Sequence, residues 1–181
     1  MQDKNIRNMV LCALFAALTA ICSQLVIPIG PVPINLATFV VFAAGAVLGS
    51  RLGAVSMAGW ALMGTLGVPV FTMLRSGPGV LLGPTGGYIV GYIPAAFLTG
   101  LLVETFNQDN KSLPYLLAMA VGMITYFGLG TAWYVYSTNT PLLQALMVCV
   151  VPFLPGDFLK AGLATVVAKR LRPAVQLPAA G

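Results

Sequence analysis

The sequence contains very little charge. No histidine occurs among its 181 residues, only four residues are Asp or Glu, and charged residues make up 7% of the chain, against about 25% in an ordinary soluble domain. Residues 8–50, 52–74, 76–103 and 112–156 contain no charged side chain. Apolar runs of that length exclude a soluble core. They predict an integral membrane protein, surrounded by membrane lipid, that forms a single domain over residues 1–181.

The lack of histidine and of acidic residues also limits the chemistry. Without histidine the chain can form neither a histidine-based triad nor an H-E-x-x-H zinc site, and its three cysteines have neither metal-site nor redox spacing. Asp3, Glu104 and Asp109 fall on the side predicted below to be the inner one, so no second carboxylate is expected beside Asp157. We therefore predict a protein that is not an enzyme and that binds no metal or cofactor.

Six apolar segments predict an all-α bundle of six transmembrane helices. The expected helices cover residues 9–27, 35–50, 52–67, 86–106, 114–136 and 155–171. A short apolar piece, residues 141–151, precedes the last helix and is expected to be a half-helix, and interrupted membrane helices often mark binding sites. Residues 68–87, rich in Gly and Pro, predict a structured loop between the third and fourth helices. Its apolar Val80-Leu81-Leu82 should cover protein or line a cavity.

The basic residues stand at the edges of the apolar runs, a pattern that orients a protein in a membrane rather than binding nucleic acid. Six spans place both termini on one side. If that side is inside, the outer face has Arg75 alone, and the inner face has seven basic residues: Lys4, Arg7, Arg51, Lys111, Lys169, Arg170 and Arg172. The sequence therefore predicts an N-in, C-in topology, with the 68–87 loop and the start of the last helix outside.

The strongest candidate site is Pro155-Gly156-Asp157-Phe158-Leu159-Lys160. Asp157 and Lys160 share a helix face because they are three residues apart, and Pro155-Gly156 suits a helix entrance. An ionisable residue within a membrane is energetically costly and points to function by default. This pattern favours a pocket open to the outside, with the acid–base pair at its floor and the 68–87 loop as its lid. The alternative is an ion pair that only caps the helix.

Gly83-Pro84-Thr85-Gly86-Gly87-Tyr88 lies at the outer entrance of the fourth helix. Its glycines either bring backbone N–H groups close to a ligand or only form a tight turn. The first helix has a small-residue surface, which serves either a partner or packing within this chain; it is formed by Ala13, Ala16, Ala17 and Ala20. Four aromatic residues suit interfacial anchors and pocket walls equally well: Trp60, Trp133, Tyr134 and Tyr136.

Together these motifs resemble the BioY family, the substrate-binding membrane subunit of biotin transporters of the energy-coupling-factor type. The resemblance extends over about residues 13–168 and depends on an ordered set of motifs. In chain order they are Pro31-Val32-Pro33-Ile34, Leu48-Gly49-Ser50-Arg51-Leu52-Gly53-Ala54, Gly67-Val68-Pro69-Val70-Phe71, the Gly83–Tyr88 motif and the Pro155–Lys160 motif. The sequence departs from the family pattern at Asn35, at Ala37 and at Met73-Leu74-Arg75.

The resemblance implies a six-helix subunit of a bacterial cell membrane that captures biotin from outside. It also implies docking, through the four alanines of the first helix, on a transmembrane coupling subunit that a pair of cytoplasmic ATPases drives. The residues of the Pro155–Lys160 motif are implied to hold the polar groups of the ligand. The full set of predicted ligand contacts is Asp157, Lys160, Tyr88, Thr85, Gly86, Gly87, Asn35 and Arg75.

An ionised Asp only accepts hydrogen bonds and Lys only donates them, so Asp157 would suit the ureido N–H groups of biotin. Lys160 would suit the carboxylate or the ureido oxygen. Alternatively, Lys160 holds Asp157 ionised and leaves Arg75, or backbone N–H groups near Gly86, to bind the carboxylate.

Three other functions stay open on the sequence alone. The same architecture suits another small vitamin. A solitary carrier coupled to protons through Asp157 is a second alternative, and an intramembrane enzyme is the third. The chain has no phosphate-binding loop, so it is not expected to hydrolyse ATP.

Overall fold

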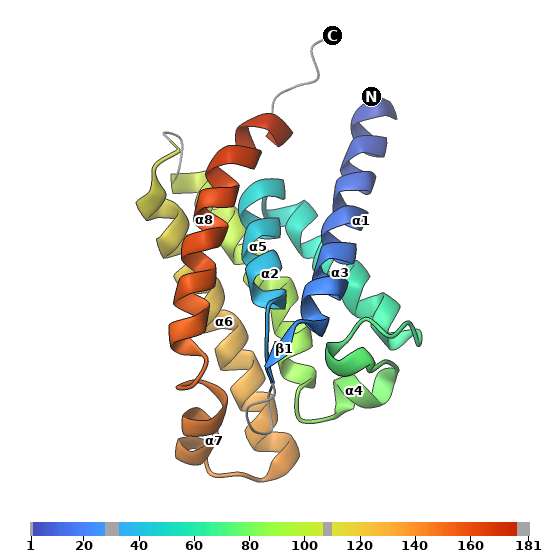
Figure 1. The fold of residues 1–181 in the computed structure, drawn as a ribbon, viewed down its shortest axis with the longest axis vertical. Coiled ribbons are helices and arrows are strands. Elements are labelled where there is room, and N and C mark those ends of the chain that lie inside the picture. Colours follow the sequence, from blue (N-terminus) through green and yellow to red (C-terminus); the bar gives the residue numbers. More distant parts are fainter. Residues whose placement is uncertain (1, 28–32, 107–109, 177–181) are drawn as a thin grey trace.

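The computed structural model describes residues 2–27, 33–106 and 110–176. Most of this part of the chain is helical, and successive long helices alternate in direction (Figure 1). The long helices are α1 (Gln2–Gln24), α2 (Ala37–Leu48), α3 (Ser50–Thr65), α5 (Gly86–Phe106), α6 (Ser112–Thr138) and α8 (Leu154–Gln176). The start of α1 and the end of α8 therefore lie at one end of the bundle, and the short helices α4 (Pro78–Leu82) and α7 (Leu142–Cys149) lie at the other.

Helix α2 forms the centre of the bundle. All of its residues except Phe39 are buried, and it packs against α1, α3, α5 and α8. Glycines allow this close packing, because a Cβ added at Gly45 would lie 2.4 Å from the backbone oxygen of Ala96 on α5. A Cβ added at Gly53 of α3 would likewise lie 2.9 Å from the Cα of Gly45.

The turn between α1 and α2 differs from the prediction. The first helix was expected to run to residue 27, but it ends at Gln24, and β1 (Val26–Ile27) pairs with β2 (Ile34–Asn35) in an antiparallel hairpin. Helix α2 begins at Ala37 rather than 35. Asn35 instead forms a local turn before the helix, in which its side chain accepts a hydrogen bond from the Ala37 N–H at 3.0 Å. Residues 28–32, which include the start of the Pro31-Val32-Pro33-Ile34 motif, and residues 107–109, which include Asp109, lie outside the described residues.

The segment between α3 and α5 is structured, as the prediction required. It contains the short helix η1 (Thr72–Leu74) and α4, whose Val80 and Leu81 are partly buried while Leu82 is exposed. Residues 70–75 are called the strap below, and Phe71 and Arg75 pair in an isolated antiparallel bridge within it. Met73 and Leu74 in the strap have φ angles of 61° and 56°, a strained conformation for residues other than glycine.

The break before the last helix is also present. Helices α7 and α8 are bent by 51° at the junction around Pro152, so residues 142–149 form the expected half-helix. Helix α8 begins at Leu154, which places Pro155 and Gly156 in its first turn together with Asp157. The N–H of Asp157 donates to the carbonyl of Phe153 at 2.9 Å.

The length and composition of the helices fit a membrane protein. Three helices in the described part are long and apolar enough to cross a bilayer, namely residues 4–24 of α1, α5 and α6, and the bent pair α7–α8 would make a fourth. Helix α2 is apolar but shorter. The protein is therefore an α-helical membrane protein with three to four such spans among the residues described.

Candidate functional site

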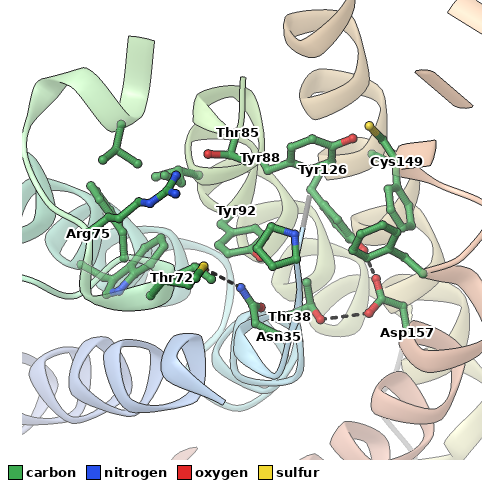
Figure 2. Close-up of a pocket in the computed structure, with 18 of the residues that line it drawn as sticks. Asn35, Thr38, Thr72, Arg75, Thr85, Tyr88, Tyr92, Tyr126, Cys149 and Asp157 are labelled. Carbon is green, nitrogen blue, oxygen red and sulfur yellow. Dashed lines mark hydrogen bonds between the residues drawn. The ribbon is translucent and has the colours of Figure 1, made fainter. Parts of the chain in front are cut away.

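A cavity of about 300 Å³ lies toward the end of the bundle that carries the strap and α7. This is within the size range of small-molecule sites. Residues from α2, α3, the strap and α4 to α8 line it (Figure 2): Pro33, Asn35, Thr38, Trp60, Phe71, Thr72, Met73, Arg75, Val80, Thr85, Tyr88, Ile89, Tyr92, Tyr126, Phe127, Cys149, Phe153, Asp157 and Lys160. The lining is mostly apolar, with a few polar groups that converge at one side.

Asp157 is the centre of this polar group, and only 1% of it is exposed. Its Oδ1 accepts hydrogen bonds from the Lys160 ammonium at 2.7 Å and from the Thr38 hydroxyl at 3.1 Å. Its Oδ2 accepts one from the Tyr126 hydroxyl. The carboxylate is therefore held by side chains of three helices, α2, α6 and α8, which compensates for its removal from water.

Lys160 uses each of its three N–H groups inside the protein. Besides Asp157, the ammonium donates to the backbone oxygen of Asn35 at 2.6 Å and to the Thr38 hydroxyl at 3.1 Å. The Asn35 side chain in turn donates to the Thr72 hydroxyl of the strap at 2.9 Å. A continuous line of hydrogen bonds thus runs from Asp157 to the strap.

Aromatic rings form the apolar walls of the cavity. Trp60 stacks on Tyr92 with ring centroids 5.8 Å apart, and its other neighbour, Phe71, meets it edge-on at 5.2 Å. Tyr126 meets Tyr92 edge-on at 5.8 Å. The Tyr88 hydroxyl pairs with that of Thr131 at 3.1 Å. Such flat, rigid walls suit a compact ring system.

The strap forms part of the cavity wall and is fixed by side chains of α1 and α3. Ser23 and Trp60 both donate to the backbone oxygen of Val70, at 2.7 and 3.1 Å. The Gln24 amide donates to the backbone oxygen of Phe71 at 3.0 Å and accepts from the N–H of Leu74 at 2.9 Å. Gln24 therefore braces the strained turn on both sides.

The sequence predicted eight ligand contacts, and six of these residues line the cavity: Asn35, Arg75, Thr85, Tyr88, Asp157 and Lys160. Gly86 and Gly87 do not. A Cβ at Gly86 would lie 1.7 Å from the Leu81 backbone oxygen, and one at Gly87 would lie 2.3 Å from Trp133 Cβ. These two glycines allow close packing at the start of α5, and the predicted contact of their backbone with a ligand stays a prediction.

The four alanines of α1 do not form one surface. Ala13 and Ala17 are exposed, whereas Ala16 is buried in the core and Ala20 is partly buried. Ala16 and Ala20 therefore pack within the bundle, and only the Ala13–Ala17 pair is available on the outside. Packing within the chain therefore applies to Ala16 and Ala20, and docking of a partner on Ala13 and Ala17 stays a prediction.

Two polar residues of the site were missed at the sequence level. Thr38 and Tyr126 contact Asp157 directly, but they lie 119 and 31 positions away in the chain. Four aromatic residues were left open. Trp60 lines the cavity, Trp133 donates to the Gly83 backbone oxygen at 2.9 Å, Tyr134 is buried in the core, and Tyr136 is 78% exposed. No sequence signal separated these roles.

A helical membrane bundle that encloses an apolar cavity with one buried polar end defines a membrane-embedded small-molecule-binding protein. A sequence model of the BioY family matches residues 1–177. The chain belongs to the BioY family, as the motif order predicted.

Similar proteins cover nearly the whole chain. The biotin transporter BioY of Thermotoga maritima is 36% identical over 170 residues, which cover 92% of this chain and 96% of that protein. BioY of Rhodobacter capsulatus is 36% identical over 180 residues, covering 91% and 93%. A crystal structure of the S-component for biotin from an ECF-type ABC transporter superposes with a TM-score of 0.88 at 31% identity, covering 96% of this chain and 94% of that one. The relatives quoted are transporters, in agreement with the expectation of a protein that is not an enzyme.

Proposed function

We propose that this protein is the biotin-binding membrane subunit of an ECF-type transporter. One observation carries the proposal: in a BioY-family chain, the cavity has the buried Asp157–Lys160 pair on one side and Arg75 on the other (Figure 2). Biotin is chemically asymmetric in the same sense, with ureido N–H donors at one end and a carboxylate at the other.

The hydrogen bonds favour one orientation of the ligand. Asp157 only accepts hydrogen bonds, so it suits the ureido N–H groups and repels a carboxylate. Because the three N–H groups of Lys160 are bound to protein oxygens, Lys160 chiefly holds Asp157 ionised. Arg75, on the strap, is then the cation that suits the carboxylate. Lys160 remains a ligand contact only if it releases one of its acceptors.

The proposal includes six membrane spans with both termini in the cytoplasm. Basic residues of α1, α3 and α8 gather at the end of the bundle opposite the cavity, where Lys169 donates to Ser112 at 2.9 Å. Helix α2, about 18 Å long, is shorter than a bilayer core of about 30 Å, but other helices enclose it and it needs little lipid contact. The cavity then opens toward the outside of a bacterial cytoplasmic membrane.

Energy would come from partner proteins. We place the docking surface for a transmembrane coupling subunit, driven by cytoplasmic ATPases, on the exposed Ala13–Ala17 face of α1. Small side chains on a membrane helix let another helix approach closely. In this scheme the chain binds biotin alone but concentrates it only together with the ATPases.

Purification in detergent, followed by mass spectrometry of the co-purified small molecule and calorimetric titration, tests the function. The proposal expects biotin, and expects biotin methyl ester to bind more weakly than biotin unless Arg75 is replaced by Gln. Co-purification of a different vitamin would show that biotin is not the ligand, but it would still support a role in binding a small molecule. Uptake by the protein alone in vesicles, driven by a pH gradient, would instead indicate a proton-coupled carrier.

A further inference from the structure

The acceptor positions of Asp157 are almost completely occupied. A carboxylate offers about four lone-pair positions, two on each oxygen. Lys160 and Thr38 occupy both positions on Oδ1, and the Tyr126 hydroxyl occupies one of the two on Oδ2. One acceptor position, on Oδ2, is left for a ligand.

The donors around this carboxylate are used up as well. Lys160 donates to Asp157, Thr38 and Asn35, and the Thr38 hydroxyl proton goes to Asp157. Among the described residues of this cluster, the open positions are therefore acceptors: one on Asp157 Oδ2, and the lone pairs of the Tyr126 oxygen. A group that meets both must offer N–H or O–H donors.

Packing fixes the place of the Tyr126 hydroxyl. Tyr126 lies on α6, is 3% exposed, and lines the cavity. Its ring centroid is 4.3 Å from that of Phe127, 5.8 Å from that of Tyr92 and 6.3 Å from that of Tyr88. A phenol held by three rings cannot swing away from the carboxylate, so it restricts rotation of the carboxylate as well.

We propose that Tyr126 is a positioning and specificity-determining residue of this site. Its hydroxyl orients Asp157 so that one Oδ2 acceptor faces the cavity, and its own oxygen provides a second acceptor beside the first. The pair selects a ligand that brings an N–H donor to this corner of the cavity, as one N–H of a cyclic urea would. This inference rests on the proposed function only for the identity of the ligand, since the contact with Asp157 exists without it.

Tyr126→Phe is the matched perturbation, because it keeps the ring and removes only the hydroxyl. Asp157 then loses one donor and its orientation, and the ligand loses the second acceptor. The dissociation constant for biotin should rise about tenfold, at the lower end of the effect of losing a hydrogen bond to a charged group. Tyr115→Phe on the same helix is the control: that buried residue's hydroxyl donates to Asn110 at 2.9 Å, at the start of α6 and outside the cavity lining.

A double-mutant cycle with Asp157→Asn separates positioning from general stability. Calorimetric titration of biotin should show the tenfold loss for Tyr126→Phe in the parent protein. The loss should be clearly smaller when Asp157 is already Asn, because only the direct contact between Tyr126 and the ligand is then removed. Tyr115→Phe should lower the thermal unfolding midpoint and leave the dissociation constant unchanged. The same cycle on thermal unfolding without ligand should show coupling between Tyr126 and Asp157.

Two results would overturn the inference. The first is an equal loss of affinity from Tyr126→Phe in both backgrounds, and the second is the absence of coupling in the ligand-free unfolding cycle. If the parent protein does not bind biotin at all, the proposed function fails, while the ligand-free cycle still decides whether Tyr126 holds Asp157.

Discussion

Replacing Asp157 by Asn is the most direct test of how the cavity recognises its ligand. Asn has nearly the shape of Asp, but it is neutral and exchanges one acceptor oxygen for an NH₂ donor. The Asp157 carboxylate accepts from Lys160, Thr38 and Tyr126, so the change affects the protein's own contacts as well as the open position on Oδ2. If the new amide takes the Oδ2 position, it presents a donor to a ligand that itself donates.

The expected loss follows from the type of bond removed. A hydrogen bond to a charged group contributes about 1.5–3 kcal/mol, which corresponds to a roughly tenfold to hundredfold weaker affinity for biotin. A second effect acts on stability: Lys160, 7% exposed, would be left as a buried cation without its counter-charge. Breaking such a pair from one side destabilises a fold by about 3–5 kcal/mol.

The two effects are separable by measurement. Thermal unfolding in detergent reports the stability, and calorimetric titration reports the affinity of the folded fraction. Asp157→Asn combined with Lys160→Met removes both charges, so it should recover much of the unfolding midpoint without recovering the affinity. If Asp157→Asn is well folded and binds biotin as tightly as the parent, Asp157 only caps α8 and the binding scheme is wrong.

The remaining predictions concern topology, docking and the strap. In a protein without its native cysteines, a cysteine at Ser76 should react with an impermeant thiol reagent from outside and one at Asn110 only from inside; the opposite pattern would invert the proposed orientation. Replacing Ala13 and Ala17 with Leu should weaken association with the coupling subunit in pull-down assays and leave the biotin affinity unchanged, since both are exposed; a loss of biotin binding would assign this pair to the bundle. Gln24→Leu removes both braces of the strap and should accelerate biotin release several-fold in stopped-flow experiments, and an unchanged release rate would show that the strap does not retain the ligand.

Local patterns in the sequence were sufficient to predict several elements. The 86–106 helix has the predicted bounds in α5, because the glycines at its start and the polar residues after it delimit one apolar run. The half-helix before the last span follows from its two prolines. Asp157 and Lys160 are paired at 2.7 Å, as a spacing of three on a helix requires. Each of these features depends on residues that are close in the chain.

Features that depend on tertiary contacts could not be predicted from local patterns. The first helix ends early because the hairpin with Ile34–Asn35 competes for its last residues. Ala16 and Ala17 are neighbours in the sequence, yet one packs in the core and the other is exposed. The space beside Gly86 and Gly87, where side chains would otherwise lie, is occupied by the backbone of Leu81 and by Trp133. A single sequence does not show which part of the fold will pack against a given small residue.

The same difference explains how the polar end of the cavity is built. Asp157 and Lys160 are close in the chain. However, a buried ion pair whose other hydrogen-bond donors and acceptors have no partners would be unstable in an apolar bundle. Thr38, Tyr126 and the Asn35 backbone form the remaining hydrogen bonds of the pair. These groups reach Asp157 and Lys160 only when α2 and α6 pack against α8. The two buried charges that indicate the site in the sequence are therefore stabilised only by contacts that the folded bundle provides. Because Asn35 also binds Thr72, the same hydrogen bonds fix the strap at the cavity wall, so an ordered strap and an ionised Asp157 depend on the same packing.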